Sequence, residues 1–174
     1  MTIDPGIAEI RKITEQLAAT AFPVSIGAFV AERAAAMGDA PAAVWFEEGL
    51  TLSYADLDRR SDALAAALLA RGIRRLSGPA LSQALARGIR KGAHVALMMS
   101  NVPEFVLSWF ALAKLGAVLV PVNTAYTSTE LDYLLNQSDS QALIVDAAFL
   151  PAFEGMSRRP ACLDDARVFV RGGG

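Results

Sequence analysis

The sequence predicts an α/β protein in which a parallel sheet of βαβ units is flanked by helices. Three apolar runs of strand length, at residues 94–99, 117–121 and 141–145, alternate with segments of helical periodicity. The runs are apolar on both faces, as strands are when helices cover both sides of a sheet. Right-handed crossovers are expected because strands twist in one sense.

Two helices are expected at the start of the chain. Isoleucine and leucine recur at near-helical spacing over residues 6–19. Ser25 is placed to cap a second helix over 26–37, and Gly38 is expected to end that helix in the left-handed conformation.

A hairpin and a long helix follow. The runs 42–46 and 50–53 flank an acidic turn, Glu47-Glu48-Gly49, which is the pattern of a hairpin. Ser53 and Asp56 stand three apart before an alanine- and leucine-rich run, so they approximate a capping box for a helix over 54–71.

The helices between the three strands have their own boundary residues. Asn101 is expected to cap a helix over 102–114, with Pro103 in its first turn and Gly116 stopping it. Thr127 and Glu130 form a capping-box pair for a helix over 128–136. A short helix over 147–155 and a last strand over 167–170 complete the pattern.

The composition limits the class of protein. The chain has 174 residues, of which 53% are hydrophobic and 20% charged, which suits one globular domain. The net charge of −2 gives nucleic acid no basic footprint. A single cysteine, Cys162, fits a reducing cytoplasm. We expect a helical extension over 1–24, a main unit over 25–170 and a tail over 171–174.

No secretory or membrane-spanning segment is expected. Asp4 and Glu9 stand where a secretory signal carries lysine or arginine. The most apolar stretch, 105–122, is interrupted by Ser108, Lys114 and Gly116, unlike a membrane span. We therefore expect a cytoplasmic protein.

Residue types that carry chemistry are sparse and scattered. Neither common phosphate-binding loop is present, and the only histidine, His94, opens a predicted strand. Ser53, Ser100 and Thr127 each stand just before a helix, so they are interpreted as caps. Trp109 and Phe110 are interpreted as core residues of their helix. Basic residues cluster locally in the sequence, at Arg71, Arg74, Arg75, Arg87, Arg90 and Lys91. The simplest interpretation is a solvent-exposed face, and binding of an anionic partner is a minority alternative. We predict no catalytic, cofactor-binding or metal-ligating residue.

Two motifs resemble those of the adenylate-forming enzymes, the family of acyl-CoA synthetases, firefly luciferase and peptide-synthetase adenylation domains. LSYADL, residues 52–57, resembles the first core motif of the family, and LAKLGAVLVPVN, residues 112–123, resembles the second. The whole of residues 88–123 is similar to an acyl-CoA synthetase, with features of the carnitine and crotonobetaine CoA ligases. The resemblance covers residues 25–170 and implies the N-terminal portion of such an enzyme.

The resemblance implies a reaction for the full-length family. An enzyme of this kind activates a carboxylic acid with ATP and magnesium as the acyl-adenylate, then transfers the acyl group to coenzyme A. The family's phosphate-clamping loop, its adenine- and ribose-binding residues and its C-terminal lysine have no counterpart before Gly174. We therefore expect no cofactor bound by this fragment and no activity of the isolated chain. The acyl substrate is not predictable from these residues.

The end of the second motif lies where a ligand is expected in a fold of this class. Pro121 ends the strand at its carboxyl edge, where open α/β sheets bind ligands. Asn123 and Thr124 lie just beyond it, and we expect them to structure the loop, with substrate contact as the alternative.

A six-residue phrase, LARGIR, occurs twice, at 69–74 and 85–90. The family joins the preceding helix to the next strand through one such phrase, so we interpret residues 75–90 as a local duplication or insertion. Ser77-Gly78-Pro79 would break a continuous helix there. We expect the excursion to be exposed, with a short helix over 79–87, and its deletion to leave stability unchanged or raised.

Three hypotheses remain open from sequence. The chain is an N-terminal fragment of an acyl-CoA synthetase, or a non-catalytic binding module, or an interaction protein that docks onto an intact ligase or a separately encoded remainder. An adjacent reading frame that begins with the phosphate-loop motif would favour a split or truncated enzyme. The absence of such a frame, together with ligand binding by the isolated chain, would favour the binding module. Copurification with an intact ligase would favour the interaction protein.

Overall fold

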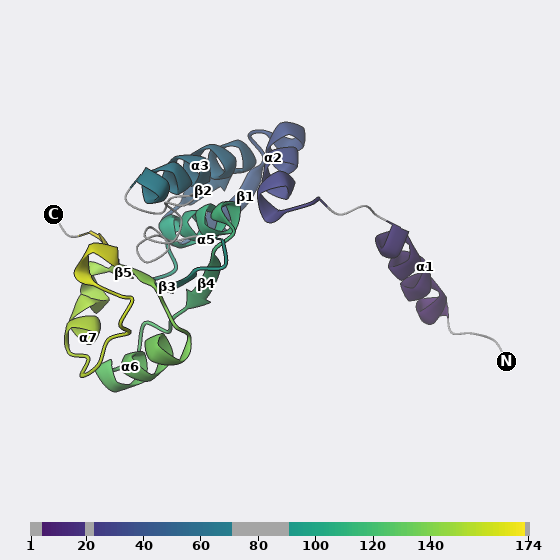
Figure 1. The fold of residues 1–174 in the computed structure, drawn as a ribbon. Helices are drawn as coiled ribbons and strands as arrows, with labels where there is room; N and C mark the ends of the chain where they lie inside the picture. Colours follow the sequence, from purple (N-terminus) through teal and green to yellow (C-terminus); the bar gives the residue numbers. More distant parts are fainter. Residues whose placement is uncertain (1–4, 20–22, 71–90, 173–174) are drawn as a thin grey trace, which may run out of the picture.

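The computed structural model describes residues 5–19, 23–70 and 91–172. A four-stranded sheet lies between helices, and a separate two-stranded hairpin lies beside it (Figure 1). The repeated LARGIR phrase falls almost entirely outside the described residues, so the insertion and its short helix stay predictions.

The sheet is parallel throughout, with strand order β4-β3-β5-β6. Its strands are β3 (His94–Met98), β4 (Val118–Pro121), β5 (Ala142–Asp146) and β6 (Val168–Arg171). Each neighbouring pair is parallel, so all four carboxyl ends meet at one edge. The predicted α/β class, the three parallel strands and the last strand are confirmed.

The two faces of the sheet are buried in two separate apolar clusters. Val95 and Leu97 of β3 point to the face covered by α3 (Tyr54–Ala70) and α5 (Pro103–Leu115), while Ala96 and Met98 point to the other face. That second face is covered by α6 (Ser128–Gln137) and α7 (Leu150–Glu154) (Figure 1). Period-two alternation thus explains why both sides of each central strand had to be apolar.

The hairpin has its own small core. Its strands β1 (Pro41–Trp45) and β2 (Leu50–Ser53) pair antiparallel, as predicted. Trp45 and Leu52 pack in a third apolar cluster with residues of α2 (Ile26–Met37), α3 and α5. The remaining elements are α1 (Pro5–Ala19) and the short 3₁₀ turns η1 (Ala147–Phe149) and η2 (Asp165–Arg167).

Most helix ends agree with the sequence prediction. The Ser25 hydroxyl accepts a hydrogen bond from the Ala28 N–H at 3.1 Å, and Gly116 is left-handed at φ 70° and ψ 21°. The Thr127 and Glu130 capping box forms with both of its hydrogen bonds. Gly38 ends α2 with φ 48°, but its ψ of −111° lies outside the left-handed helical region.

Two predictions about α5 are wrong. The cap is Val102 rather than Asn101, because Pro103 occupies the first helical position and forces the residue before it into an extended conformation. Trp109 is 50% exposed rather than in the core, because it lies two positions after buried Leu107, about 200° round the helix.

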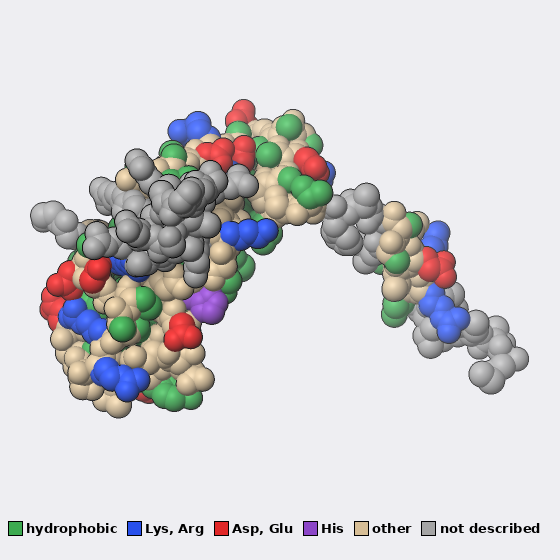
Figure 2. Space-filling view, viewed as in Figure 1, with side chains coloured by type: hydrophobic (Ala, Val, Ile, Leu, Met, Phe, Trp, Pro, Cys, Tyr) green, Lys and Arg blue, Asp and Glu red, His purple; other side chains and the backbone are tan. Residues whose placement is uncertain are grey.

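Among the described residues, each helix is too short or too polar to cross a membrane. Acidic and basic side chains are interspersed over the face shown in Figure 2.

Candidate functional site

The carboxyl edge of the parallel sheet is the natural place to look for a ligand site in this fold. Three segments bring polar groups there: Ser100 just after β3, Asp146 at the end of β5 and Arg171 at the end of β6. The first turn of α5 adds Glu104. The parallel register therefore gathers residues that are up to 71 positions apart in the chain.

Asp146 is the centre of this group, and its side chain is almost fully buried. One carboxylate oxygen accepts a hydrogen bond from the Ser100 backbone N–H at 3.0 Å, and the other accepts one from the Arg171 guanidinium at 3.1 Å. Arg171 also donates to the Glu104 carboxylate at 3.2 Å. The ends of three strands and the start of α5 are thereby tied together.

The charged side chains at this edge are paired with one another. Partial burial disfavours the Arg171 cation, yet the hydrogen bond to Asp146 and the negative charge of Glu104 outweigh this and raise the pKa of Arg171 above its ordinary value. The positive charge of Arg171 is therefore balanced by two carboxylates. Within the described ranges, no group of three acidic, histidine or cysteine side chains is placed to hold a metal ion. The edge is therefore a structural junction that joins three strands and a helix.

The residues after β4 form a turn at the same edge. The Asn123 side-chain oxygen accepts a hydrogen bond from the Ala125 N–H at 3.0 Å, and the Asn123 carbonyl accepts one from the Tyr126 N–H at 3.1 Å. This is the loop-structuring arrangement expected of Asn123. Thr124 is half-buried in the same loop.

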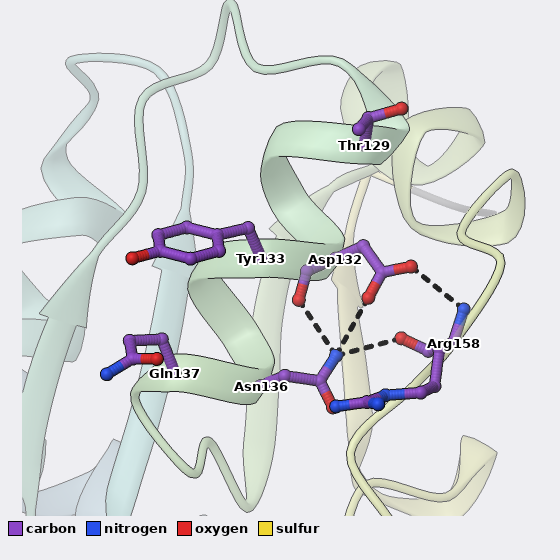
Figure 3. A pocket seen from close by; sticks show the side chains of 6 residues that line it. All are labelled: Thr129, Asp132, Tyr133, Asn136, Gln137 and Arg158. Carbon is purple, nitrogen blue, oxygen red and sulfur yellow. Dashed lines mark hydrogen bonds between the residues drawn. The ribbon is translucent and has the colours of Figure 1, made fainter.

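A shallow polar pocket of about 360 Å³ lies elsewhere, on the outer side of α6 (Figure 3). Its lining residues are Thr129, Asp132, Tyr133, Asn136, Gln137 and Arg158. Tyr133 and Gln137 point away from the side on which Asp132, Asn136 and Arg158 contact one another (Figure 3). The lining does not converge on one point, as side chains do around a specific ligand.

Asp132 joins α6 to the loop that follows α7. It accepts hydrogen bonds from the Ser157 hydroxyl at 2.6 Å and the Arg158 N–H at 2.9 Å, and Asn136 donates to its other oxygen at 2.9 Å. The Ser157 hydrogen bond is the main cause that lowers the pKa of Asp132 below its ordinary value, because it stabilises the carboxylate. These bonds use both oxygens to hold the loop.

The side chains considered from sequence stay apart from one another. His94 is half-buried and its Nδ1 lies 2.5 Å from the Ser138 carbonyl oxygen at the end of α6. Cys162 is exposed, and its thiol donates to the Ser140 carbonyl oxygen. The Ser53 hydroxyl caps α3 by accepting from the Asp56 N–H at 3.1 Å, whereas Ser100 acts through its backbone N–H.

Sequence reasoning missed Asp146, Glu104 and Arg171 as a group. One signal was available, because Asp146 directly follows four apolar residues of a predicted strand and so had to lie at the carboxyl edge. Nothing in the sequence indicated that Arg171, expected in a tail, continues β6 and reaches it.

Comparisons with known proteins agree with this architecture. A family described as AMP-binding enzyme matches residues 79–168. The putative acyl-CoA synthetase YngI of Bacillus subtilis is 40% identical over 121 residues, which cover 70% of this chain and 19% of that protein. A crotonobetaine/carnitine–CoA ligase of Shigella flexneri is 38% identical over 87 residues, covering 47% of this chain and 17% of the relative.

Solved structures give the same result for the fold. The N-terminal domain of FACL13 from Mycobacterium tuberculosis superposes with a TM-score of 0.68 at 27% identity, covering 85% of this chain and 34% of that one. A long-chain-fatty-acid–CoA ligase from Archaeoglobus fulgidus superposes with a TM-score of 0.69 at 24% identity. The chain spans about a fifth of the length of the curated relatives it matches. On the matched residues, the chain belongs to the AMP-binding enzyme family.

Proposed function

We propose that the chain is the N-terminal scaffold of an ATP-dependent acyl-CoA synthetase and that it is inactive by itself. The acyl-CoA synthetase and CoA ligase relatives support the reaction class. The small share of those relatives that the chain spans supports a scaffold role.

In the complete enzyme, ATP and magnesium would activate a carboxylic acid as the acyl-adenylate, and coenzyme A would then take the acyl group. The residues described here bind none of these groups on our proposal. Their part is to build the sheet and to fix the positions at which the chain leaves its carboxyl edge.

The pairing of charges at the carboxyl edge is the observation that carries this proposal. Asp146, Arg171 and Glu104 are bonded to one another and to the backbone, so their charges hold strands and a helix together. Catalysis of adenylation depends on positioned charges that stabilise the triphosphate as it reacts. Paired groups of this kind do not supply that stabilisation without being pulled apart.

The test is acid-dependent exchange of labelled pyrophosphate into ATP by the purified 174-residue chain, with a panel of short-chain, long-chain and betaine-like acids. We expect exchange at background level with every acid. The full-length crotonobetaine/carnitine–CoA ligase serves as the positive control. Exchange by this chain above background with any acid would overturn the proposal.

A further inference from the structure

The N-terminal helix α1 has an apolar side that no described residue of the chain covers. Ile10 and Ile13 are three positions apart, so they lie on one side of the helix, and both are exposed. Figure 1 shows α1 lying away from the rest of the chain. A helix of 15 residues is only marginally stable in water by itself, because most helical stability in proteins comes from packing of the apolar side. Helix α1 therefore needs a surface that covers it.

The ends and the polar side of α1 do not replace this packing. No acidic residue lies in its first turn and no basic residue in its last, so side-chain charges do not offset the helix dipole. The polar side mixes Glu9 and Glu15 with Arg11 and Lys12. Helices that lie on membrane surfaces are instead rich in lysine and arginine on that side. The composition of α1 therefore favours a protein surface as its partner.

Helix α2 carries a second apolar surface, which we call the outer side of α2. Val30 is the one residue of this fully described helix that is buried. Ile26, Phe29 and Met37 are exposed along the outer side. Arg33 lies among them, with its guanidinium carbon 5.8 Å from the centre of the Phe29 ring. The outer side of α2 thus offers apolar area and a positive charge to a partner helix.

We infer that α1 of one copy packs on the outer side of α2 of a second copy, so that two chains exchange their N-terminal helices. Each chain has one apolar helix to donate and one apolar surface to receive it, and the two lie apart within the chain (Figure 1). Reciprocal exchange covers both and closes with two-fold symmetry. Glu9 flanks the apolar side of α1 and is opposite in charge to Arg33 on α2. Neither surface belongs to the parallel sheet, so the inference does not depend on the proposed function.

The experiment is sedimentation equilibrium of the full 174-residue chain over a range of concentrations, with one variant of each surface. Ile13→Glu places a charge on the apolar side of α1, and Phe29→Glu places one on the outer side of α2. Phe46→Glu is the matched control, because it makes the same change at a still more exposed phenylalanine in the hairpin. All three positions are exposed in the single chain, so urea unfolding should show that each variant stays folded.

We expect the wild type and Phe46→Glu to form dimers of equal affinity. Ile13→Glu and Phe29→Glu should each weaken dimerisation at least about a hundredfold, or about tenfold at each of two equivalent contacts, because an unpaired carboxylate is buried there. Mixing these two variants should restore association, since the intact α1 of the Phe29→Glu chain meets the intact α2 of the Ile13→Glu chain. That mixed dimer has one sound contact, so it should be weaker than the wild-type dimer.

Three results would contradict the inference. The first is a wild type that stays monomeric, whether because α1 folds back on its own α2 or because it binds vesicles of anionic lipid instead. The second is a dimer that is insensitive to Phe29→Glu, as when α1 pairs with α1, or one that is equally sensitive to Phe46→Glu. The third is a mixture of Ile13→Glu and Phe29→Glu chains that stays monomeric, which would show that α1 and α2 of different copies do not meet.

Discussion

The central strand β5 and the hairpin β1–β2 show how differently two β regions of one chain are stabilised. Every residue of β5 is buried, with neighbours on both edges and helices on both faces. The hairpin buries Trp45 and Leu52 on one face, while Phe46 is 90% exposed at its turn end. Two strands alone are marginally stable, so the hairpin depends on what packs against that one face.

The difference teaches where stability resides in this chain. Because both faces of β5 are covered, each of its side chains packs in an apolar core. Removing a methylene group from one of them therefore leaves a cavity. In the hairpin, the side chains on the outer face remain exposed to water after folding, so their burial contributes little to stability. The parallel sheet should therefore be the cooperative unit, and the hairpin should open at lower cost.

The largest expected effect comes from a matched pair of leucines. Leu143 in β5 is 0% exposed and Leu50 in β2 is 47% exposed. Leu143→Ala should lower the free energy of unfolding by about 2–5 kcal/mol. Leu50→Ala should change it by at most about 0.5 kcal/mol, as surface substitutions do. Urea unfolding of both variants measures the difference, and equal effects would break the comparison between the two regions.

The next effect tests whether the polar end of the sheet belongs to the same unit. Asp146→Ala leaves the Ser100 N–H and the Arg171 guanidinium without their shared partner. We expect a loss of about 2 kcal/mol, typical of a hydrogen bond to a charged group. Glu104→Ala, which removes a more exposed carboxylate from the same arginine, should cost less than half as much. A reversed order in urea unfolding would show that Asp146 is not the organising residue.

The parallel sheet was predictable because its strands are short, apolar on both faces and separated by capped helices. His94–Met98 ends one residue before the expected range and Ala142–Asp146 is shifted by one residue, since burial on both sides requires apolar residues over most of each strand. The capping box of Thr127 and Glu130 was predictable for a local reason, because its hydrogen bonds join residues three apart.

The remainder could not be predicted because it depends on tertiary contacts. Trp109 lies on the exposed side of a helix whose buried stripe is set by α3 and the sheet, and apolar character alone does not fix that side. The junction of Asp146, Arg171 and Glu104 joins three segments, and their meeting requires the strand order β3-β5-β6. Sequence motifs identified the family but not this polar group.

A smaller effect concerns the link between the two regions. The side chain of Lys114 on α5 is 10% exposed, and it contacts Asp58 and Asp62 of α3, the helix that follows the hairpin. Asp58 is the less exposed partner, and Lys114 also donates to its backbone carbonyl at 3.0 Å. We expect Asp58→Asn to cost about 1 kcal/mol and Asp62→Asn less than about 0.5 kcal/mol in urea unfolding. Equal costs would show that the salt bridge does not distinguish its two carboxylates.

The smallest effect lies at the exposed start of α6, where the capping box closes the helix that covers the sheet. Hydrogen bonds from the Thr127 backbone N–H and then from its hydroxyl lower the pKa of Glu130 below its ordinary value of 4.5. A carboxyl group whose pKa is depressed by folding stabilises the folded state above its unfolded pKa, and this contribution is lost as the pH falls through the lower folded pKa.

Glu130→Gln should therefore be slightly less stable than the wild type at neutral pH, and the difference should vanish once the pH is below the folded pKa of Glu130. Thr127→Ala removes the hydroxyl hydrogen bond to the carboxylate, so it should return the pKa of Glu130 part of the way toward its ordinary value. It keeps the Thr127 backbone N–H, so some of the shift should remain. Urea midpoints of the three chains measured across the acid range give the stability differences, and carbon-detected NMR titration gives the pKa. A stability difference that grows on acidification would reverse the sign of this argument and show that the carboxylate is not stabilised by the cap.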